Sequence, residues 1–439
     1  MCGSIKQVMA AAAELIVRRV PRRVYLVPVS ADPWFEGFED LPGVKSSLAW
    51  MLAPVTVQTF LDELWGAAPH HIGRGRTDYF DRLAGPSITE QLLAALRTEP
   101  SAVRLVRGAD HLAPEQYTLA DGGLDPDRIR AELGNGYTMI CNNIEKYLRA
   151  MSTLTHGVEV ELNFPTHVNA YVTPPGSTGF LPHYDHHDVL VLQVQGAKTW
   201  YFYGDDPVPP HLMQQMYEVD PAGLPEPTSL HLAAGDTLYL PRGRVHSAAA
   251  TSEVSVHLTV GIHVPTVLTL LTHALHMLSL RDDVVHTRLP AKHLDDPRVR
   301  ADLRALIHDG VAAIEDPGVL TDGLDAMQDF LVRRARCPVV GQVSDTIGID
   351  AATLVRKRQP LYSRVTASAD GVGLQFAQLL VSARSDHGAA MRFLSESTEP
   401  FRIGDLPGLA TAQQIELARS LIMSGFLVRC DTGEVEPRP

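Results

Sequence analysis

The sequence predicts an α+β protein in which helical segments flank a central unit of short strands. Between residues 166 and 264, short segments rich in β-branched and aromatic residues alternate with Gly and Pro. Before and after this unit, apolar residues recur at helical spacing. The first pattern is typical of an antiparallel barrel or double-sheet sandwich.

Length and charge limit the classes of protein that fit. A chain of 439 residues, 45% hydrophobic and 20% charged, indicates a globular protein with two or three domains. Thirty-eight basic and fifty-one acidic residues give a formal net charge of −13. That balance disfavours a broad surface for nucleic acid or an anionic membrane, so we expect neither partner. No run of about 18 apolar residues predicts a membrane span.

The spacing of the cysteines and the pattern of the first residues indicate in which cellular compartment the protein lies. Cys2, Cys141, Cys337 and Cys430 lie far apart and form no CxxC pair, which favours a reducing cytoplasm. In "MCGSIKQVMAAAAELIVRRVPRR" the basic residues mostly follow the apolar stretch, the reverse of a secretory signal. We therefore predict an amphipathic helix there and a cytoplasmic protein.

The region before the strands divides into an extension and a helical part. Residues 1–45 are interrupted by four prolines and are predicted to be an extension. From about 55 to 150 the pattern is mostly helical, with Thr56 as a helix cap in "TVQTFLDELWG". Ser87 and Glu90 have the spacing of a capping box.

The region after the strands is again helical. Residues 265–336 carry apolar faces such as "VLTLLTHALHML" that a small barrel cannot fully cover, and we expect a homodimer built on them. Residues 337–439 are predicted to form a small helical domain that ends in a strand.

Alternation along the strands identifies a polar face. In "HVNAYV", Asn169 and Tyr171 share one face of the strand. In "EVSVHLTVGIH", the apolar residues alternate with Ser255, His257, Thr259, Gly261 and His263. A polar inner face in a small barrel usually lines a site.

Three side chains within or near these strands suggest a metal. In "LPHYDHHDVL", His183 and Asp185 share a face if the segment is extended. His246, in "LYLPRGRVHSAAA", is the best candidate for a third ligand. Each of these residues alone is commonly structural. Together, two imidazoles and one carboxylate form the facial triad that binds Fe(II) and leaves three coordination positions open.

The open positions suggest a cosubstrate. Two positions can take a bidentate 2-oxo acid, and the third can take O₂. A distal carboxylate on that acid then needs a cation. Lys198, at the start of "KTWYFYG", is the predicted partner.

The five polar residues that begin at His183 cannot all follow strict alternation. Burial of residues 189–194 requires a bend or bulge near His186. After the bend, we expect Asp188 at the cavity mouth, where it would meet substrate. We expect His186 and His187 to be rim residues, since a fourth protein ligand would block O₂ or 2-oxoglutarate.

The stretches "VNAYVTPPGSTGFLPHYDHHDVLVLQVQGAKTWYFYG" and "LAAGDTLYLPRGRVHSA" resemble the JmjC-type, cupin-fold ribosomal oxygenases. These are Fe(II)- and 2-oxoglutarate-dependent protein hydroxylases. The similarity covers roughly residues 50–264. It implies a double-stranded β-helix (the cupin or JmjC jelly roll) at 46–264, a helical dimerisation region at 265–336 and a winged-helix-like domain at 337–439.

The resemblance also implies roles for single residues. His183, Asp185 and His246 fall where the family has its iron ligands, and Lys198 where it pairs with 2-oxoglutarate. Asn169 and Thr259 match supporting contacts to the cosubstrate, and Tyr171 matches an aromatic residue that faces substrate. The chain departs from the family at His186, where an acidic residue is usual, while Asp188 keeps a second acidic position.

We therefore expect an oxygenase that hydroxylates a C–H bond of a protein or peptide side chain, with a ribosomal protein implied as the substrate. Two alternatives within the enzyme class are an N-methyl-lysine demethylase and a hydroxylase of a natural-product peptide or small metabolite. No residue separates them. A non-enzyme alternative, a cupin-sensor transcriptional regulator, is disfavoured because residues 340–439 carry ten basic and eleven acidic residues.

Overall fold

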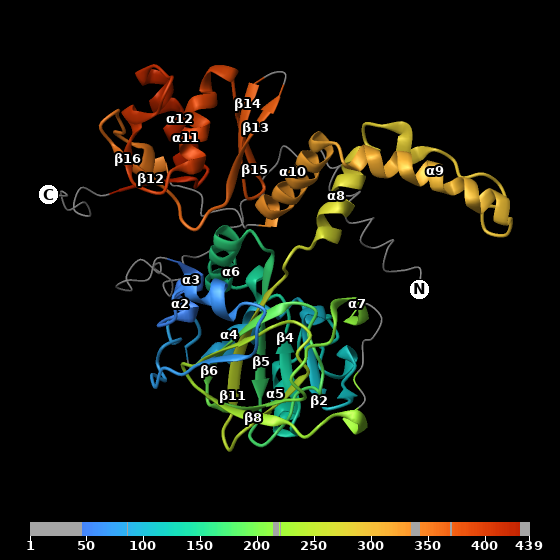
Figure 1. Ribbon diagram of the computed structural model, residues 1–439. Helices are drawn as coiled ribbons and strands as arrows, with labels where there is room; N and C mark the ends of the chain where they lie inside the picture. Colours follow the sequence, from blue (N-terminus) through green and yellow to red (C-terminus); the bar gives the residue numbers. More distant parts are fainter. Residues whose placement is uncertain are drawn as a thin grey trace. The chain divides into compact units, whose positions relative to one another are not determined.

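The computed structural model of the chain describes residues 46–430, apart from 86, 214–218, 220, 335–342 and 369–370 (Figure 1). The predicted extension at 1–45, with its amphipathic helix, lies outside the described residues. Among the described helices, none combines the length and the apolar character needed to cross a bilayer.

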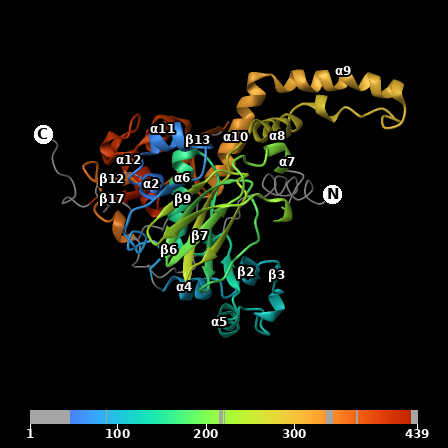
Figure 2. The same ribbon diagram turned by 60° about the horizontal axis from the view of Figure 1, so that its bottom comes forward.

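Two antiparallel sheets form the central unit (Figures 1 and 2). In spatial order, the larger sheet consists of β1 (His70–Ile72), β9 (Thr237–Leu240), β6 (Asp188–Gln195), β11 (Ser255–Ile262), β5 (Thr166–Thr173), β4 (Thr138–Cys141), β2 (Val103–Arg107) and β3 (Asp110–His111). The smaller sheet consists of β10 (His246–Ala250), β7 (Ala197–Phe202) and β8 (Thr228–Ala233). The predicted antiparallel strands between 166 and 264 are thereby confirmed.

The two sheets share a core. Val189, Val191, Leu238 and Leu240 of the larger sheet cluster with residues of the smaller one, namely Trp200, Phe202 and Leu232. All are at most 7% exposed, and burial of each such side chain contributes about 1.5–3 kcal/mol. Val189, Trp200 and Leu240 of this cluster also line a cavity between the two sheets. This is the double-sheet sandwich that the sequence predicts.

Helices precede and accompany the first strands. They are α2 (Ser47–Leu52), α3 (Val57–Thr59) continuing into the π-helix η2 (Phe60–Leu64), α4 (Ile88–Ala95), α5 (Pro126–Gly134), α6 (Arg149–Leu162) and, after β7, α7 (Pro210–Met213). Thr56 caps α3 as predicted, since its hydroxyl accepts a bond from the amide of Thr59 at 3.0 Å. The predicted capping box at Ser87 is wrong, because that hydroxyl makes no cap bond and instead accepts from the side-chain Nε2 of Gln91 at 3.1 Å.

The expectation of a mostly helical region at 55–150 is incomplete. Four short strands, β1 to β4, arise from it and extend the larger sheet at both edges. Strands of two to five residues give too few alternations for the pattern to stand out. Their pairing with β9 and β5 fixes them instead.

Three helices follow the sandwich, as predicted: α8 (Val267–Ser279), α9 (Pro297–Ile314) and α10 (Pro317–Arg334). Helices α8 and α10 approach closely at Gly323, where an added Cβ would lie 3.0 Å from Ala274. Much of the apolar face of α8 stays uncovered, with Val267 74% and Leu268 60% exposed.

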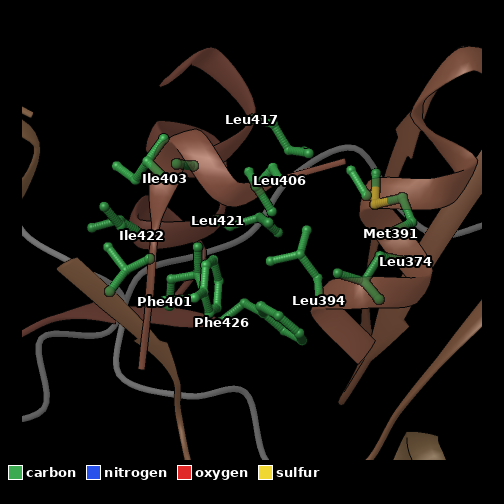
Figure 3. Close-up of a cluster of buried hydrophobic side chains, with 14 of the residues drawn as sticks. Leu374, Met391, Leu394, Phe401, Ile403, Leu406, Leu417, Leu421, Ile422 and Phe426 are labelled. Atoms are coloured by element: carbon green, nitrogen blue, oxygen red, sulfur yellow. The ribbon is translucent and has the colours of Figure 1, made fainter. Parts of the chain in front are cut away.

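The last part of the chain contains more strands than predicted. One sheet has the order β16 (Phe401–Arg402), β12 (Leu354–Lys357), β17 (Leu427–Arg429), and the other the order β13 (Ser363–Ser368), β14 (Gly371–Phe376), β15 (Leu379–Ala383). Helices α11 (Gly388–Glu396) and α12 (Thr411–Met423) share one core with these sheets, built from residues such as Leu374, Leu394, Leu421 and Phe426 (Figure 3). The terminal strand is confirmed as β17. The β13–β15 sheet was not predicted.

Short 3₁₀ turns connect these elements. They are η3 (Pro100–Ala102), η4 (Pro114–Gln116), η5 (Ile144–Lys146), η6 (Pro221–Gly223), η7 (Asp283–His286), η8 (Val343–Thr346), η9 (Ser385–His387) and η10 (Ile403–Asp405).

Candidate metal centre and cosubstrate cavity

The backbone brings the three predicted metal ligands together. His183 and His246 form an isolated β-bridge, in which each amide donates to the carbonyl of the other at 3.0 and 2.8 Å. The carbonyl of Asp185 accepts from the amide of Gly243 at 2.9 Å. Gly243 has φ +80°, and a Cβ there would lie 2.7 Å from the carbonyl oxygen of Val208, so this tight turn requires glycine. The loop before β6 is thus fixed to the turn before β10.

The ligand atoms of the triad face one another. The rings of His183 and His246 lie 4.5 Å apart between centroids, and His246 Nε2 lies 3.8 Å from Asp185 Oδ2. All three ligand atoms lie within 4.8 Å of one another. Each histidine has its Nδ1 at a backbone carbonyl, Leu181 at 2.8 Å and Arg244 at 2.9 Å. Such bonds fix the Nδ1–H tautomer and leave each Nε2 to a metal.

The local charges favour the forms that coordinate metals. Burial, reinforced by His183, lowers the pKa of His246 to about 4, so the ring is neutral at pH 7. Burial alone would raise the pKa of Asp185, but the neighbouring histidines, His246 first, hold it below its usual value. Neutral imidazole and ionised carboxylate are the states that bind a divalent ion. The residues therefore fit an Fe(II) site.

A cavity between the two sheets opens beside the triad. It is lined by Tyr171, Gly179, Phe180, His183, Asp185, Val189, Lys198, Trp200, Leu240, His246, Ala248, His257 and Thr259. Tyr171, His257 and Thr259 come from strands of the larger sheet, and Lys198, Trp200 and Ala248 from the smaller one. The predicted residues Tyr171, Lys198 and Thr259 thus meet the triad in one cavity.

Lys198 is a buried cation that lacks an anion. Lys198 is only 2% exposed, and burial lowers the pKa of its ammonium group to about 7. Among the described residues, no carboxylate pairs with its ammonium, and its Nζ lies 6.0 Å from the centroid of the Tyr171 ring. A buried charge without a partner is unfavourable, so this position is suited to a ligand carboxylate.

Two cavity residues with polar ring nitrogens, Trp200 and His257, were not among the predicted site residues. His257 stacks on Tyr171, its register partner across β11 and β5, at 4.6 Å and 6° between ring planes. Within the described part of the chain, His257 Nδ1 and Trp200 Nε1 are buried without a hydrogen-bond partner. Unpaired buried groups of this kind cost about 1–3 kcal/mol each. The polar face of "EVSVHLTVGIH" includes His257, so the sequence pattern already indicated that this residue would line a site.

Asn169 lies beside the cavity and does not line it. Its Oδ1 accepts from the amide of Asn143 at 2.9 Å, and it faces Thr259 in the strand register. Burial raises the pKa of Tyr171 to about 12, opposed by hydrogen bonds with Thr259 and Asn169. Asn169 therefore contacts the tyrosine that lines the cavity.

The bend near His186 is confirmed, but the expected position of Asp188 is wrong. Residues 186 and 187 form a bend, and β6 already begins at Asp188, which pairs with Ile262. Asp188 is 3% exposed, and its carboxylate accepts from the Tyr239 hydroxyl at 2.7 Å. Burial raises its pKa. The side chain is a buried partner of Tyr239 and does not reach the cavity mouth. His186 packs near Tyr184, at 5.6 Å between ring centroids.

Comparison with known proteins agrees with this geometry. Residues 148–270 match the family model of the JmjC domain. The chain is 28% identical over 227 residues to the bifunctional lysine-specific demethylase and histidyl-hydroxylase NO66 of Drosophila mojavensis, covering 50% of this chain and 25% of that protein. It is 26% identical over 250 residues to the protein of the same name from Culex quinquefasciatus, covering 56% and 38%. The chain thus spans well under half the length of these curated relatives.

Among solved structures, the chain resembles Escherichia coli YcfD, with a TM-score of 0.54 and 18% identity over 85% of this chain and 98% of that one. A structure of YcfD, a ribosomal oxygenase, in complex with cobalt and 2-oxoglutarate matches with a TM-score of 0.52 and 18% identity over 86% and 98%. At 18% sequence identity, this similarity shows a common fold and nothing further. The chain therefore contains a JmjC domain and has the cupin-type fold of that structural relative.

Proposed function

We propose that this chain is an Fe(II)- and 2-oxoglutarate-dependent oxygenase that hydroxylates a C–H bond of a protein or peptide side chain. One observation carries the proposal: His183, Asp185 and His246 converge in the cavity that also contains the unpaired Lys198. Three protein ligands leave room for the two oxygens of a 2-oxo acid and for O₂. When bound, iron and 2-oxoglutarate supply the oxidation, in which one oxygen atom goes to succinate, the other to substrate, and CO₂ leaves.

The residues of the chain bind, orient and exclude water. The Nδ1 contacts to Leu181 and Arg244 hold the two imidazoles in the metal-binding tautomer. Lys198 binds the distal carboxylate of 2-oxoglutarate through a charge-assisted hydrogen bond. Tyr171 and Phe180, whose rings lie 6.5 Å apart, shield the cavity from water beside His183.

Our proposal for the substrate class rests on the descriptions of the similar proteins. NO66 is named as a lysine demethylase and histidyl-hydroxylase, and YcfD is described as a ribosomal oxygenase. Both descriptions concern proteins, so we propose a protein side chain, with a ribosomal protein as the first candidate. Demethylation of N-methyl-lysine is the second candidate, favoured by the name of the curated relatives, because the same oxidation at an N-methyl carbon releases formaldehyde.

The assembly and the compartment are also proposals. Residues 46–264 form the catalytic domain, 265–336 the dimerisation region and 337–439 a winged-helix-like domain. The apolar face of α8 supports a homodimer, since Val267, Leu268, Leu271 and Leu275 are between 41% and 74% exposed. A reducing cytoplasm fits Cys141, which is free and buried. No direct contact with nucleic acid or membrane is proposed.

The decisive experiment couples two measurements. Purified full-length protein with Fe(II), 2-oxoglutarate and O₂ is assayed for succinate, and a cell lysate treated with it is searched by mass spectrometry for side chains that gain one oxygen atom. His246→Ala should abolish both signals. His231→Ala, which removes an exposed histidine of β8, is the matched control. Succinate production that survives His246→Ala would overturn the assignment, and peptides that lose methyl groups would favour the demethylase.

A further inference from the structure

A second histidine cluster lies at one edge of the larger sheet. His167 is the second residue of β5, His187 immediately precedes β6, and His263 immediately follows β11. Because β11 runs antiparallel between β5 and β6, the end of β11 meets the start of both neighbours. One nitrogen of each ring lies within 4.8 Å of the other two.

The three rings are arranged almost symmetrically. Their centroids are 4.9, 4.9 and 4.8 Å apart, and His167 Nδ1 lies 2.9 Å from His263 Nε2. A tetrahedral zinc ion with metal–nitrogen bonds of about 2.0–2.1 Å places imidazole centroids roughly 5.2 Å apart and their nitrogens roughly 3.3 Å apart. The centroid separations of the trio therefore lie within a few tenths of an ångström of those around a zinc ion, and its ligand nitrogens, all within 4.8 Å of one another, would have to move together by at most about 1.5 Å.

The protonation state suits a metal. Burial, followed by the charges of His187 and His263, lowers the pKa of His167 to about 3. Burial and His187 lower that of His263 to about 4. Both rings are neutral at pH 7 and offer lone pairs. Arg334 also opposes protonation of the two rings, and its own charge is paired with Glu159 at 2.9 Å.

The backbone makes room for the cluster. Gly261 is the cross-strand partner of His167, and a Cβ at that position would lie 2.2 Å from Cε1 of the imidazole and 2.8 Å from each of its nitrogens. The ring of His167 therefore lies against a position that only glycine can occupy without displacing it. This observation is independent of the ring distances.

We propose that His167, His187 and His263 form a second metal site, which takes Zn²⁺ with a non-protein fourth ligand. Three imidazoles with one open position are a donor set that zinc prefers. None of the three lines the cavity of the iron triad. His187 is two residues from Asp185, so the ion would tie the loop that carries this iron ligand to the ends of β5 and β11. The site does not rest on the proposed oxygenase activity.

The test isolates the second site by removing a ligand of the first. Metal-free, full-length His246→Ala protein is titrated with Zn²⁺ against a chromophoric chelator. One equivalent should bind, and adding His263→Ala should weaken that binding by at least about 100-fold, beyond the roughly 10- to 100-fold effect of outer-shell changes. His263 is exposed except where its ring packs on His167 and His187, so its loss should change the melting temperature of the metal-free chain only slightly. His231→Ala in the same background is the control.

Cobalt provides a second readout that does not depend on activity. Co²⁺ in a four-coordinate site gives far stronger visible absorption than in a six-coordinate site. We expect this absorption in His246→Ala and its loss in His246→Ala/His263→Ala. Gly261→Ala, which keeps all three ligands, should also lose it. Zinc affinity that is unchanged by His263→Ala, or the absence of any saturable equivalent in His246→Ala, would show that the trio is only a hydrogen-bonded histidine cluster and overturn the proposal.

Discussion

Replacement of Lys198 by methionine should weaken 2-oxoglutarate binding and stabilise the ligand-free protein at the same time. Burial lowers the pKa of Lys198 from 10.5 to about 7, which corresponds to roughly 4–5 kcal/mol of destabilisation by the buried charge. Methionine has similar length and no charge, so it removes this destabilisation of the folded protein. The ligand-bound protein loses a charge-assisted bond of about 1.5–3 kcal/mol, which is roughly a 10- to 150-fold increase in Kd.

The sign of the pH dependence follows from the same pKa. Between pH 7 and 10.5 the unfolded chain binds more protons at Lys198 than the folded chain, so wild-type stability rises with pH in this window. The stability gain of Lys198→Met should therefore be largest at pH 6 and shrink toward pH 10. Affinity of the wild type for 2-oxoglutarate should fall as pH rises above about 7, because the neutral amine cannot pair with the carboxylate.

Urea unfolding at pH 6, 7.5 and 9 measures the stability, and calorimetric titration of metal-loaded protein measures the affinity. Lys146→Met, which neutralises an exposed lysine, is the control and should change neither. A Lys198→Met protein that is less stable than wild type at pH 6, or one that binds 2-oxoglutarate with unchanged affinity, would refute the assignment of Lys198 as an anion site.

Three further predictions concern other parts of the molecule. In a His263→Ala background, which removes the second histidine cluster, His246→Ala should abolish stoichiometric Fe(II) binding, measured by metal analysis after anaerobic loading, because two ligands are too few to retain a labile ion. Asp188→Ala should lower the unfolding free energy by about 1–3 kcal/mol, since the Tyr239 hydroxyl loses its buried acceptor, while 2-oxoglutarate affinity stays unchanged; a large loss of affinity with normal stability would contradict this. Leu268→Asp with Leu271→Asp should give a monomer by light scattering at micromolar concentration, and a monomeric wild type would remove the proposed dimer.

The triad and its cation could be predicted from the sequence because each rests on local rules. His183 and Asp185 share a face through the two-residue period of an extended segment. His246 follows a strand of the larger sheet and a turn that leads into the smaller sheet, and its bridge to His183 brings the two histidines together. Lys198 lies on the next strand at an inward-facing position.

Other features depend on pairing that no local pattern specifies. His167 and His263 are 96 residues apart, and only the order β5–β11–β6 brings them to His187. The prediction for Asp188 is wrong because β6 begins at this residue, directly after the bend at 186 and 187, and Tyr239, which lies 51 residues away, then becomes its partner. Short edge strands such as β3, at Asp110–His111, are defined by their neighbours.

The segment from His183 to Asp188 contains many polar residues because it has two roles, which fall on successive residues. His183 and Asp185 provide ligand atoms to the triad, while their backbones bond to His246 and Gly243. His187 packs against His167, and Asp188 accepts a hydrogen bond from Tyr239, so the residues that follow the ligands attach the loop to the larger sheet. A metal site requires ligand positions fixed to about half an ångström. Because both ends of this short loop are held by hydrogen bonds or ring contacts, the chain can place two ligands accurately outside a regular strand.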